Sequence, residues 1–546
     1  MLMEFGQFIL EHSQDDPAQL ALSRARFAGA VTDFDLALTT LEVRRKLRDK
    51  VPEWYAVPSL RFPLRLSGEQ CSSTSTARYK ASVAVALGSV AADLTPQPAL
   101  SAQNACCHVS SDAAAGTSPK KRLLSGSPST NGASPVLDPS QNPLSSTNGA
   151  SLVLEPSQNP LSSTNGASPV LELSQNPNSC TDYAPFVHGG RSADLTGGLG
   201  VDSWAFAQVF DQVLYNEMRP ELAAAAAHNF RELGLTNITV RNFALVPAAS
   251  AAPDSSSCPA PTDPSCPAPT GHPLIAGSDP GSPSASVFQI LGDFRPDVVF
   301  LDPARRASDG RKVFRLEDCQ PDVLQLLPEL LAACPRILLK LSPMADITLV
   351  CKQLGCVKAV HVVAADGECK ELLLVLEKDW SGPHTLTIVE DGAVVDVTDF
   401  CPSTAKTYQN CGRRHDFSDV YHAQPGSALF EPGKALLKAG AFDLPCQFGL
   451  TKLGQHTHLY TGEEIPEALQ PFGKCFRIIE MAPLDKRSIK AFGQQYPQAE
   501  VTARNIPLTS DQLRAKLGVR SGGTVHIFGL HSDALRSNLL LATERL

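Results

Sequence analysis

The stretch DLTGGLG, from Asp194 to Gly200, follows an apolar run and precedes a helix-like segment. Glycine has no Cβ, so Gly197, Gly198 and Gly200 allow the backbone to turn tightly and to pass close under a ligand. A second apolar run, QVLYNE, ends in Glu217, which lies 23 positions after Asp194. An acid at the end of the second strand of a doubly wound sheet can hold both hydroxyls of a ribose. The pattern predicts a nucleoside-binding site, and an ordinary tight β–α turn is the alternative for the glycines.

Strand-like and helix-like segments alternate around these motifs, as is typical of a mainly parallel sheet that is buried on both faces. Two late strand-like runs, 359–365 and 371–377, have only DGECK between them, which favours a hairpin and an antiparallel last strand. We therefore predict an α/β fold with a Rossmann-like core, a helical N-terminal part and a small C-terminal α/β domain. The reversed last strand is typical of S-adenosylmethionine (SAM) methyltransferases and not of NAD-binding domains.

A second motif, DPARR, follows a later apolar run, and ligands of open α/β sheets bind outside the carboxyl ends of the strands. Asp302 is the candidate that orients an amine acceptor or accepts its proton, and Pro303 stiffens the loop. Arg305 and Arg306 are candidates for holding a phosphate or a carboxylate, with ion pairs to nearby acids as the alternative. Lys340 ends the next strand on the same rim, where it is expected to bind substrate unless its ammonium simply reaches water.

Further residues are candidates for SAM binding. Asp194 and Thr196 would lie near the amino-acid tail of SAM, and Glu217 would hold the ribose. Asp202 either contacts the cofactor or caps the helix that it begins. Asn242 lies where an amide often meets the adenine amino group, with a plain turn residue as the alternative. No metal is expected, because the methyl group of SAM is already activated.

Composition limits the class of protein. The 546 residues are enough for two to four domains, and the net charge of −9 gives no global signature of nucleic-acid binding. Residues 451–546 are mildly basic, with 12 Lys and Arg against 9 Asp and Glu. The 15 cysteines include no C-x-x-C pair, and the acidic start does not look like a secretory signal. Because no apolar stretch is long enough to span a bilayer, we expect a cytoplasmic protein without membrane contact, and an organellar location stays open.

The composition also changes along the chain. A 17-residue repeat, with Thr130, Thr147 and Thr164 at equivalent positions, lies in a Ser-, Pro- and Asn-rich tract that has too few large apolar residues to form a core. The predicted organisation is a helical region 1–94, a disordered insertion 95–190, a core 191–380 with a disordered insertion 247–285, a small segment 381–472 and a C-terminal domain 473–546.

Several motifs together resemble one family. They are QCSSTSTARYKA (70–81), ADLTGGLGVDS (193–203), FLDPARR (300–306), LKLSPMADI (339–347), GECKELL (367–373), EPGKALLKAGAF (431–442) and THLYT (457–461). The chain is similar to a mostly bacterial set of class I SAM-dependent methyltransferases with a ferredoxin-like segment and a C-terminal THUMP-like domain. The resemblance covers nearly the whole chain except the two low-complexity insertions. It implies SAM as cofactor and, through the THUMP-like domain, an RNA substrate.

The QCSS block stands before the glycine turn, where many such enzymes have a segment that folds over SAM. Arg78 and Lys80 are candidates for RNA phosphate contacts, and Cys71, Ser72 and Ser73 could line the pocket. A loop that caps the following helix is the alternative. The function that we predict is methylation of a base nitrogen of structured RNA, tRNA or rRNA. A protein or small-molecule methyltransferase and a non-catalytic SAM- or RNA-binding module are the alternatives.

Overall fold

The computed structural model describes residues 3–27, 29, 31–88, 189–250, 282–305, 315–397 and 423–546. Residues 105–184 lie outside this described part of the chain. The same holds for most of the two segments predicted to be disordered, 95–190 and 247–285. Among the described helices, none is both long and apolar enough to cross a membrane.

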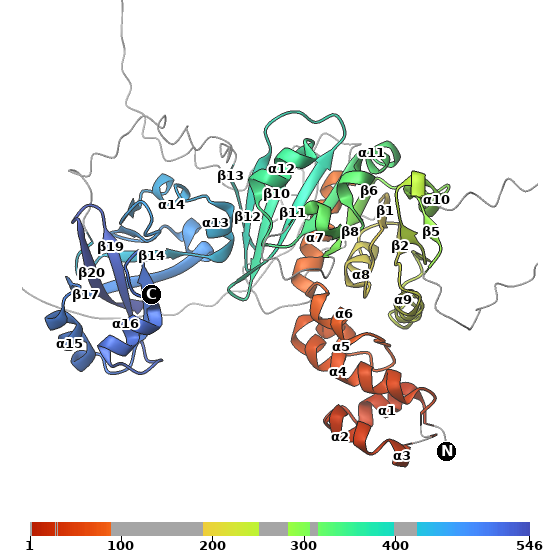
Figure 1. The fold of residues 1–546 in the computed structure, drawn as a ribbon, viewed down its shortest axis with the longest axis horizontal. Helices are drawn as coiled ribbons and strands as arrows, with labels where there is room; N and C mark the ends of the chain where they lie inside the picture. The colour runs from red at the N-terminus through yellow and green to blue at the C-terminus, as the bar shows by residue number, and fades with distance from the viewer. Residues whose placement is uncertain are drawn as a thin grey trace, which may run out of the picture. The chain divides into compact units, whose positions relative to one another are not determined.

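A nine-stranded sheet with the order β13-β12-β10-β11-β9-β6-β1-β2-β3 carries the glycine turn (Figure 1). Strands β3, β2, β1, β6 and β9 are parallel to one another, and β11 is antiparallel to both β9 and β10. The predicted reversal of the last core strand is therefore confirmed. The strands are β1 (Arg191–Asp194), β2 (Gln212–Asn216), β3 (Ile238–Arg241), β6 (Val298–Leu301), β9 (Arg336–Leu341), β10 (Val357–Ala365), β11 (Glu368–Glu377), β12 (Thr385–Glu390) and β13 (Ala393–Val397).

The hairpin of β12 and β13 extends this sheet beyond the expected boundary. β12 pairs with β10 in parallel, and β13 pairs with β12 in antiparallel orientation. The first sheet thus continues past residue 380, where the composition of the sequence suggested a boundary. Two short pairs complete the region: β4 (Ala244–Leu245) with β5 (Ser284–Ala285), and β7 (Ala304–Arg305) with β8 (Cys319–Gln320).

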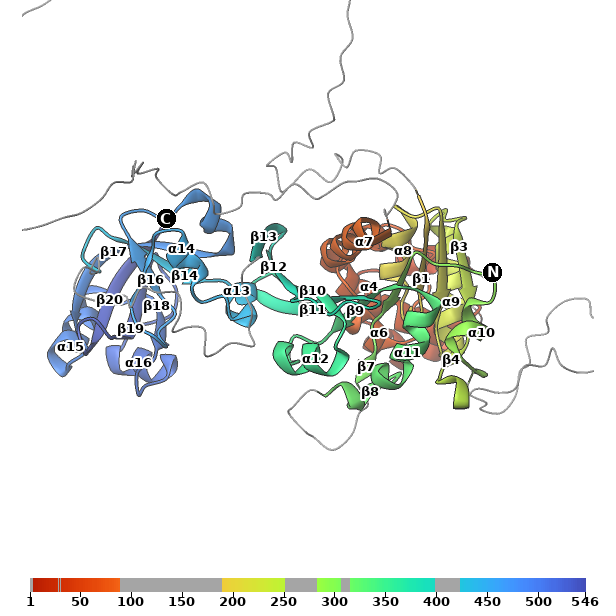
Figure 2. The same ribbon diagram turned by 90° about the horizontal axis from the view of Figure 1, so that it is seen from above.

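Helices cover both faces of the sheet (Figure 2). Successive side chains of a strand point to opposite sides, so a strand that is apolar throughout needs cover on both faces. Val298 and Phe300 of β6 belong to one buried cluster, and Val299 and Leu301 belong to the other. The first cluster contains residues of α7 (Thr74–Gly88), α8 (Val201–Ala207) and α9 (Pro220–Glu232). The second contains residues of α10 (Val287–Leu291), α11 (Val323–Ala333) and α12 (Ile347–Leu354).

The N-terminal region is helical, as its apolar periodicity predicts. It contains α1 (Phe5–Glu11), α2 (Pro17–Leu22), α3 (Arg24–Phe27), α4 (Phe34–Lys50), α5 (Pro52–Tyr55) and α6 (Arg65–Gln70). Helix α4 has two buried sides. Leu38 and Leu41 pack in a small cluster with Phe8, whereas Val43 and Leu47 join the cluster that contains α7 and α8. The N-terminal helices are thereby anchored to the helix that follows the glycine turn.

A seven-stranded sheet with the order β15-β16-β14-β17-β20-β19-β18 forms the C-terminal part. Its strands are β14 (Ala428–Pro432), β15 (Thr451–Lys452), β16 (Tyr460–Gly462), β17 (Gly473–Pro483), β18 (Glu500–Arg504), β19 (Val525–Ser532) and β20 (Ser537–Arg545). Its helices are α13 (Lys434–Ala439), α14 (Leu444–Gln447), α15 (Lys486–Gln495) and α16 (Ser510–Leu517). Because β14 pairs with β17, the segments predicted at 381–472 and 473–546 share one sheet.

Candidate cofactor and acceptor site

The backbone angles and the packing of the turn after β1 explain why it contains glycines. Gly198 and Gly200 have φ of 55° and 96°, in the left-handed region that side chains disfavour. A Cβ on Gly197 would lie 2.1 Å from the ring of Tyr215, and one on Gly200 would lie 2.7 Å from that of Phe230. At Gly198 the nearest atom to such a Cβ is 3.9 Å away. The turn is thus packed tightly at Gly197 and Gly200, whereas the Cα side of Gly198 is uncrowded and can face a ligand.

Glu217 closes the turn from the neighbouring strand. Its Oε2 accepts a hydrogen bond of 2.9 Å from the amide of Gly198, and its Oε1 accepts one of 2.9 Å from the amide of Arg219. Burial raises the pKa of Glu217, and these two amides act in the opposite direction. Each carboxylate oxygen keeps a second lone pair, so the fixed carboxylate can still accept two hydroxyl groups. Asn242 donates to the backbone oxygen of Glu217 at 2.6 Å, as a turn residue would.

Asp194 lies fully buried at the end of β1. Its Oδ2 accepts from Ser203 Oγ at 2.6 Å, and its Oδ1 accepts from the amide of Thr196 at 3.1 Å. Burial raises the pKa of Asp194 to about 8. The hydrogen bond from Ser203 acts to lower this pKa, whereas the negative charges of Asp202 and Asp302 act to raise it further. Thr196 Oγ1 in turn accepts from the amide of Asp302 at 2.6 Å. Asp194 and Thr196 therefore brace the ends of β1 and β6, and their contact with a cofactor stays a prediction.

Asp302 and Lys340 form an ion pair at the ends of β6 and β9. Burial lowers the pKa of Lys340, but the charges of Asp302, Glu371 and Asp202 outweigh it, so the pKa is raised. Lys340 is thus a permanently charged partner of Asp302 and does not extend into water. The side chain of Asp302 keeps 34% of its surface exposed, which leaves it accessible to an acceptor.

The two arginines of the DPARR motif can be placed only in part. Pro303 is buried directly after β6, and Arg305 pairs through its backbone with Cys319 in β8. The side chain of Arg305 and the whole of Arg306 lie outside the described residues. Their contacts with phosphate remain predictions.

A buried charge cluster lies behind this rim. Lys80 is fully buried, and its Nζ donates to both carboxylate oxygens of Glu371 at 3.0 and 2.9 Å and to Ser72 Oγ at 2.8 Å. It also lies 3.2 Å from Asp202 Oδ1, while Ser72 Oγ donates to Asp202 Oδ2 at 2.9 Å. The expected contact of Lys80 with RNA phosphate is therefore wrong. Asp202 is not a helix cap either, since it joins the turn after β1 to the QCSS block.

The sequence held a signal for this burial that our prediction missed. Lys80 comes three positions after Ala77 and directly before Ala81, and all three lie on the face of α7 that packs into the core. Glu371 begins an apolar run in β11, where an unpaired acid would be costly. A buried base on a helix and a buried acid on a strand are each unfavourable alone, so they indicate a pair.

Of the two roles that the sequence left open for the QCSS block, the structure shows the helix cap, whereas a pocket-lining role for Cys71, Ser72 and Ser73 stays a prediction. Ser73 Oγ accepts from the amide of Thr76 at 3.3 Å and so caps α7, whereas Ser72 belongs to the charge cluster. Arg78 pairs with Glu53 at 2.9 Å and lies over the ring of Trp204. A phosphate contact of Arg78 would have to compete with this pair.

Two segments match known families. Residues 429–469 match a ferredoxin-like domain, and residues 473–544 match a THUMP domain-like family. The chain therefore carries both C-terminal parts that the sequence resemblance implied. Over 100% of both chains, the structure is similar to the crystal structure of a predicted methyltransferase from Porphyromonas gingivalis W83, with 22% identity and a TM-score of 0.62.

The chain has a Rossmann-like methyltransferase fold. Weaker similarity extends to a Thermus thermophilus 16S rRNA N2 G1207 methyltransferase in complex with AdoMet and guanosine, with 13% identity, a TM-score of 0.22 and coverage of 35% of this chain and 37% of that one. It extends also to M. capricolum TrmK in complex with S-adenosyl-homocysteine, with 9% identity, a TM-score of 0.21 and coverage of 36% of this chain and 65% of that one. The sequence matches no curated protein.

Proposed function

We propose that the protein is a class I SAM-dependent methyltransferase that acts on a base nitrogen of structured RNA, either tRNA or rRNA. One observation carries the proposal. The glycine turn, the fixed carboxylate of Glu217 and the Asp302–Lys340 pair all lie at the carboxyl ends of four mutually parallel strands, β1, β2, β6 and β9. This is the edge at which open α/β sheets bind their ligands.

The residues present fit the cofactor. When bound, SAM supplies a methyl group on a sulfonium, which needs no further activation. Glu217 would accept the ribose hydroxyls, and the uncrowded Cα side of Gly198 would lie against the cofactor. Asn242 would approach the adenine. Asp194, with its raised pKa, would become ionised more readily beside the ammonium of the amino-acid tail.

Asp302 is the residue to which we assign the acceptor. The attacking nitrogen gains positive charge as its bond to the methyl carbon forms and the carbon–sulfur bond breaks. A carboxylate held in place stabilises that charge and accepts a hydrogen bond from the nitrogen. Because the ion pair with Lys340 holds the Asp302 carboxylate in place, we assign Asp302 the role of orienting the acceptor, and the released proton passes to water.

RNA as the acceptor is supported by the THUMP-like segment and by the positive charge of residues 451–546. Structured RNA is recognised largely through its shape and its phosphates, which a separate basic domain can supply. The methyltransferase core would then receive the base that this docking brings near Asp302.

The test is transfer of labelled methyl groups from SAM to total RNA from a strain that lacks the protein. We expect label in RNA with the wild-type chain and a loss of at least about 100-fold with Asp302→Asn, in the range found for a positioned polar group in an active site. Asp211→Asn is the matched control, because Asp211 is exposed just before β2, at the opposite edge of the sheet. Calorimetry with SAM shows whether each variant still binds the cofactor.

Two results would contradict the proposal. Full labelling of RNA by the Asp302→Asn variant would show that Asp302 has no role in the reaction. SAM binding without label in any RNA, with label in protein or small molecules instead, would assign the enzyme to another acceptor class.

A further inference from the structure

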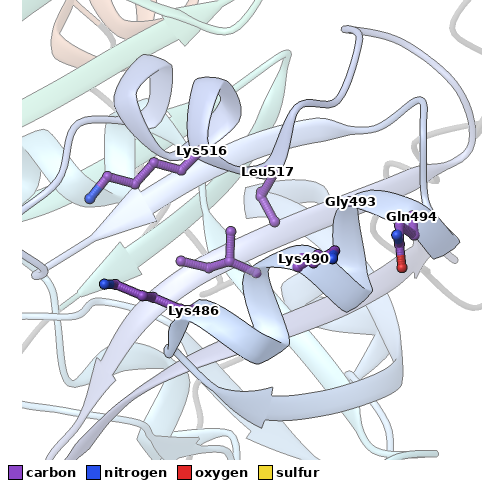
Figure 3. Close-up of a pocket in the computed structure, with 7 residues that line it drawn as sticks. Lys486, Lys490, Gly493, Gln494, Lys516 and Leu517 are labelled. Carbon is purple, nitrogen blue, oxygen red and sulfur yellow. The ribbon is translucent and has the colours of Figure 1, made fainter.

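A groove of about 510 Å³ lies between α15 and α16 of the THUMP-like domain (Figure 3). Its charged lining consists of Lys486, Lys490 and Lys516, and its apolar lining includes Ile489 and Leu517. Figure 3 shows the ammonium groups of Lys486 and Lys516 on the same side of the groove, with Lys490 further along α15. The groove thus combines three lysines from two helices with an apolar floor.

The sequence builds this groove through spacing and one glycine. Lys486 and Lys490 are four positions apart, so they lie on one face of α15. A Cβ on Gly493 would lie 1.9 Å from the carbonyl oxygen of Leu517. Only glycine allows the two helices to come so close, and this approach brings Lys516 of α16 beside the lysines of α15.

The positive charge of the groove is not neutralised by its surroundings. No acid lines it, and in the part of the chain that the structure describes none of the three lysines forms an ion pair. The acids on the same helices are engaged elsewhere: Asp485 caps α15 by accepting from the amide of Ser488 at 2.8 Å, and Asp511 pairs with Arg514 at 3.1 Å. Gathered like charges repel each other, so this arrangement favours an anion in the groove.

We infer that this groove binds the phosphate backbone of the RNA substrate. Lysine ammonium groups are flexible point charges, which suit backbone phosphates and carry no base specificity. Three lysines can contact successive phosphates along an extended groove. The inference rests on the proposed function for the choice of RNA as partner, but it concerns binding and not methyl transfer.

The experiment measures binding of the full chain to a short structured RNA hairpin over a series of salt concentrations. Each lysine that neutralises a phosphate adds about 0.7 to 0.9 to the slope of log K against log salt concentration. The triple variant Lys486→Gln/Lys490→Gln/Lys516→Gln should therefore reduce that slope by roughly 2 to 3. The three side chains are exposed, so the variant should fold normally, which thermal unfolding would verify.

Lys474→Gln is the matched control. Lys474 is exposed on β17 and shares the side of Phe476, which packs in a different cluster from the one under α15 and α16. We expect this substitution to change the salt slope by less than the triple variant does. An equal reduction by both would overturn the groove as the site and leave only diffuse charge.

Failure of the groove and failure of the proposed function give different results. Methyl transfer to RNA by the wild type, with an unchanged salt slope and unchanged KM in the triple variant, would overturn the groove alone. RNA binding that depends on the three lysines, without methyl transfer to RNA, would support the groove and contradict the proposed function. Loss of binding to polyglutamate in the triple variant, with RNA binding intact, would overturn the inference in favour of an acidic protein partner.

Discussion

Replacing Lys80 with Met tests how the structure holds the site together. Methionine is similar in length and carries no charge, so the substitution removes the ammonium with little change in packing. The carboxylates of Glu371 and Asp202 would then remain buried without their cationic partner. Because Asp202 lies in the first turn of α8, directly after the glycine turn, we expect the destabilisation to weaken cofactor binding as well.

The magnitude follows from the burial of the pair. Removing one partner of a buried ion pair costs about 3–5 kcal/mol, since the remaining charge is uncompensated. Lys80 is fully buried, so solvent screens this interaction little. Burial raises the pKa of Glu371, and the charge of Lys80 partly opposes this rise. Without Lys80, the pKa of Glu371 should therefore be still higher. Protonation of Glu371 then relieves part of the penalty at acid pH, and the loss of stability should grow as pH rises.

Urea unfolding followed by tryptophan fluorescence measures this loss, since Trp54 and Trp204 lie in the same core cluster as α7. The double variant Lys80→Met/Glu371→Leu should regain part of it, with a coupling of about 1–3 kcal/mol. Lys46→Met is the control, because Lys46 forms an exposed ion pair with Glu69 and its replacement should change the free energy of unfolding little. Equal effects of Lys80→Met and Lys46→Met, or no recovery in the double variant, would refute the reasoning.

Three further substitutions probe the glycine turn. Gly197→Ala would place a Cβ against the ring of Tyr215 and should destabilise the turn by about 1–3 kcal/mol, which calorimetry would detect as SAM binding weakened roughly tenfold or more. Tyr215→Phe removes the 2.6 Å hydrogen bond to the carbonyl of Gly198 and should cost about 1 kcal/mol in urea unfolding, whereas an unchanged midpoint would show that water replaces it. Asp194→Asn should remove a pH dependence. With its pKa near 8, folded Asp194 keeps a proton that the unfolded chain releases near pH 4. Wild-type stability should therefore fall between those values by up to about 1.4 kcal/mol per pH unit relative to the variant, and parallel pH profiles would contradict this.

Local patterns were enough to predict the core of the fold. The order of strands and helices, the short DGECK link and the apolar runs gave the parallel sheet with its reversed strand, β11. The site followed from the same order, because the carboxyl ends of parallel strands meet at one edge. Asp194, Glu217 and Asp302 lie where this rule puts them.

Partners across long distances in the chain could not be predicted. Lys80 and Glu371 are 291 positions apart, and helical spacing shows that Lys80 is buried without showing which acid it meets. The pairing of the β12–β13 hairpin with β10 depends on an open sheet edge, which the local sequence does not show. Composition likewise placed a boundary at 380 and could not show that the sheet continues beyond it.

The pairing of β14 with β17 has a consequence for modularity. The two family matches meet between residues 469 and 473, yet five residue pairs of β14 and β17 join them into one sheet. A recombination event or a truncation at that junction would leave two unpaired strand edges, which tend to associate with other chains. We therefore expect the ferredoxin-like and THUMP-like segments to fold stably only when they are expressed together, although two separate family matches describe them.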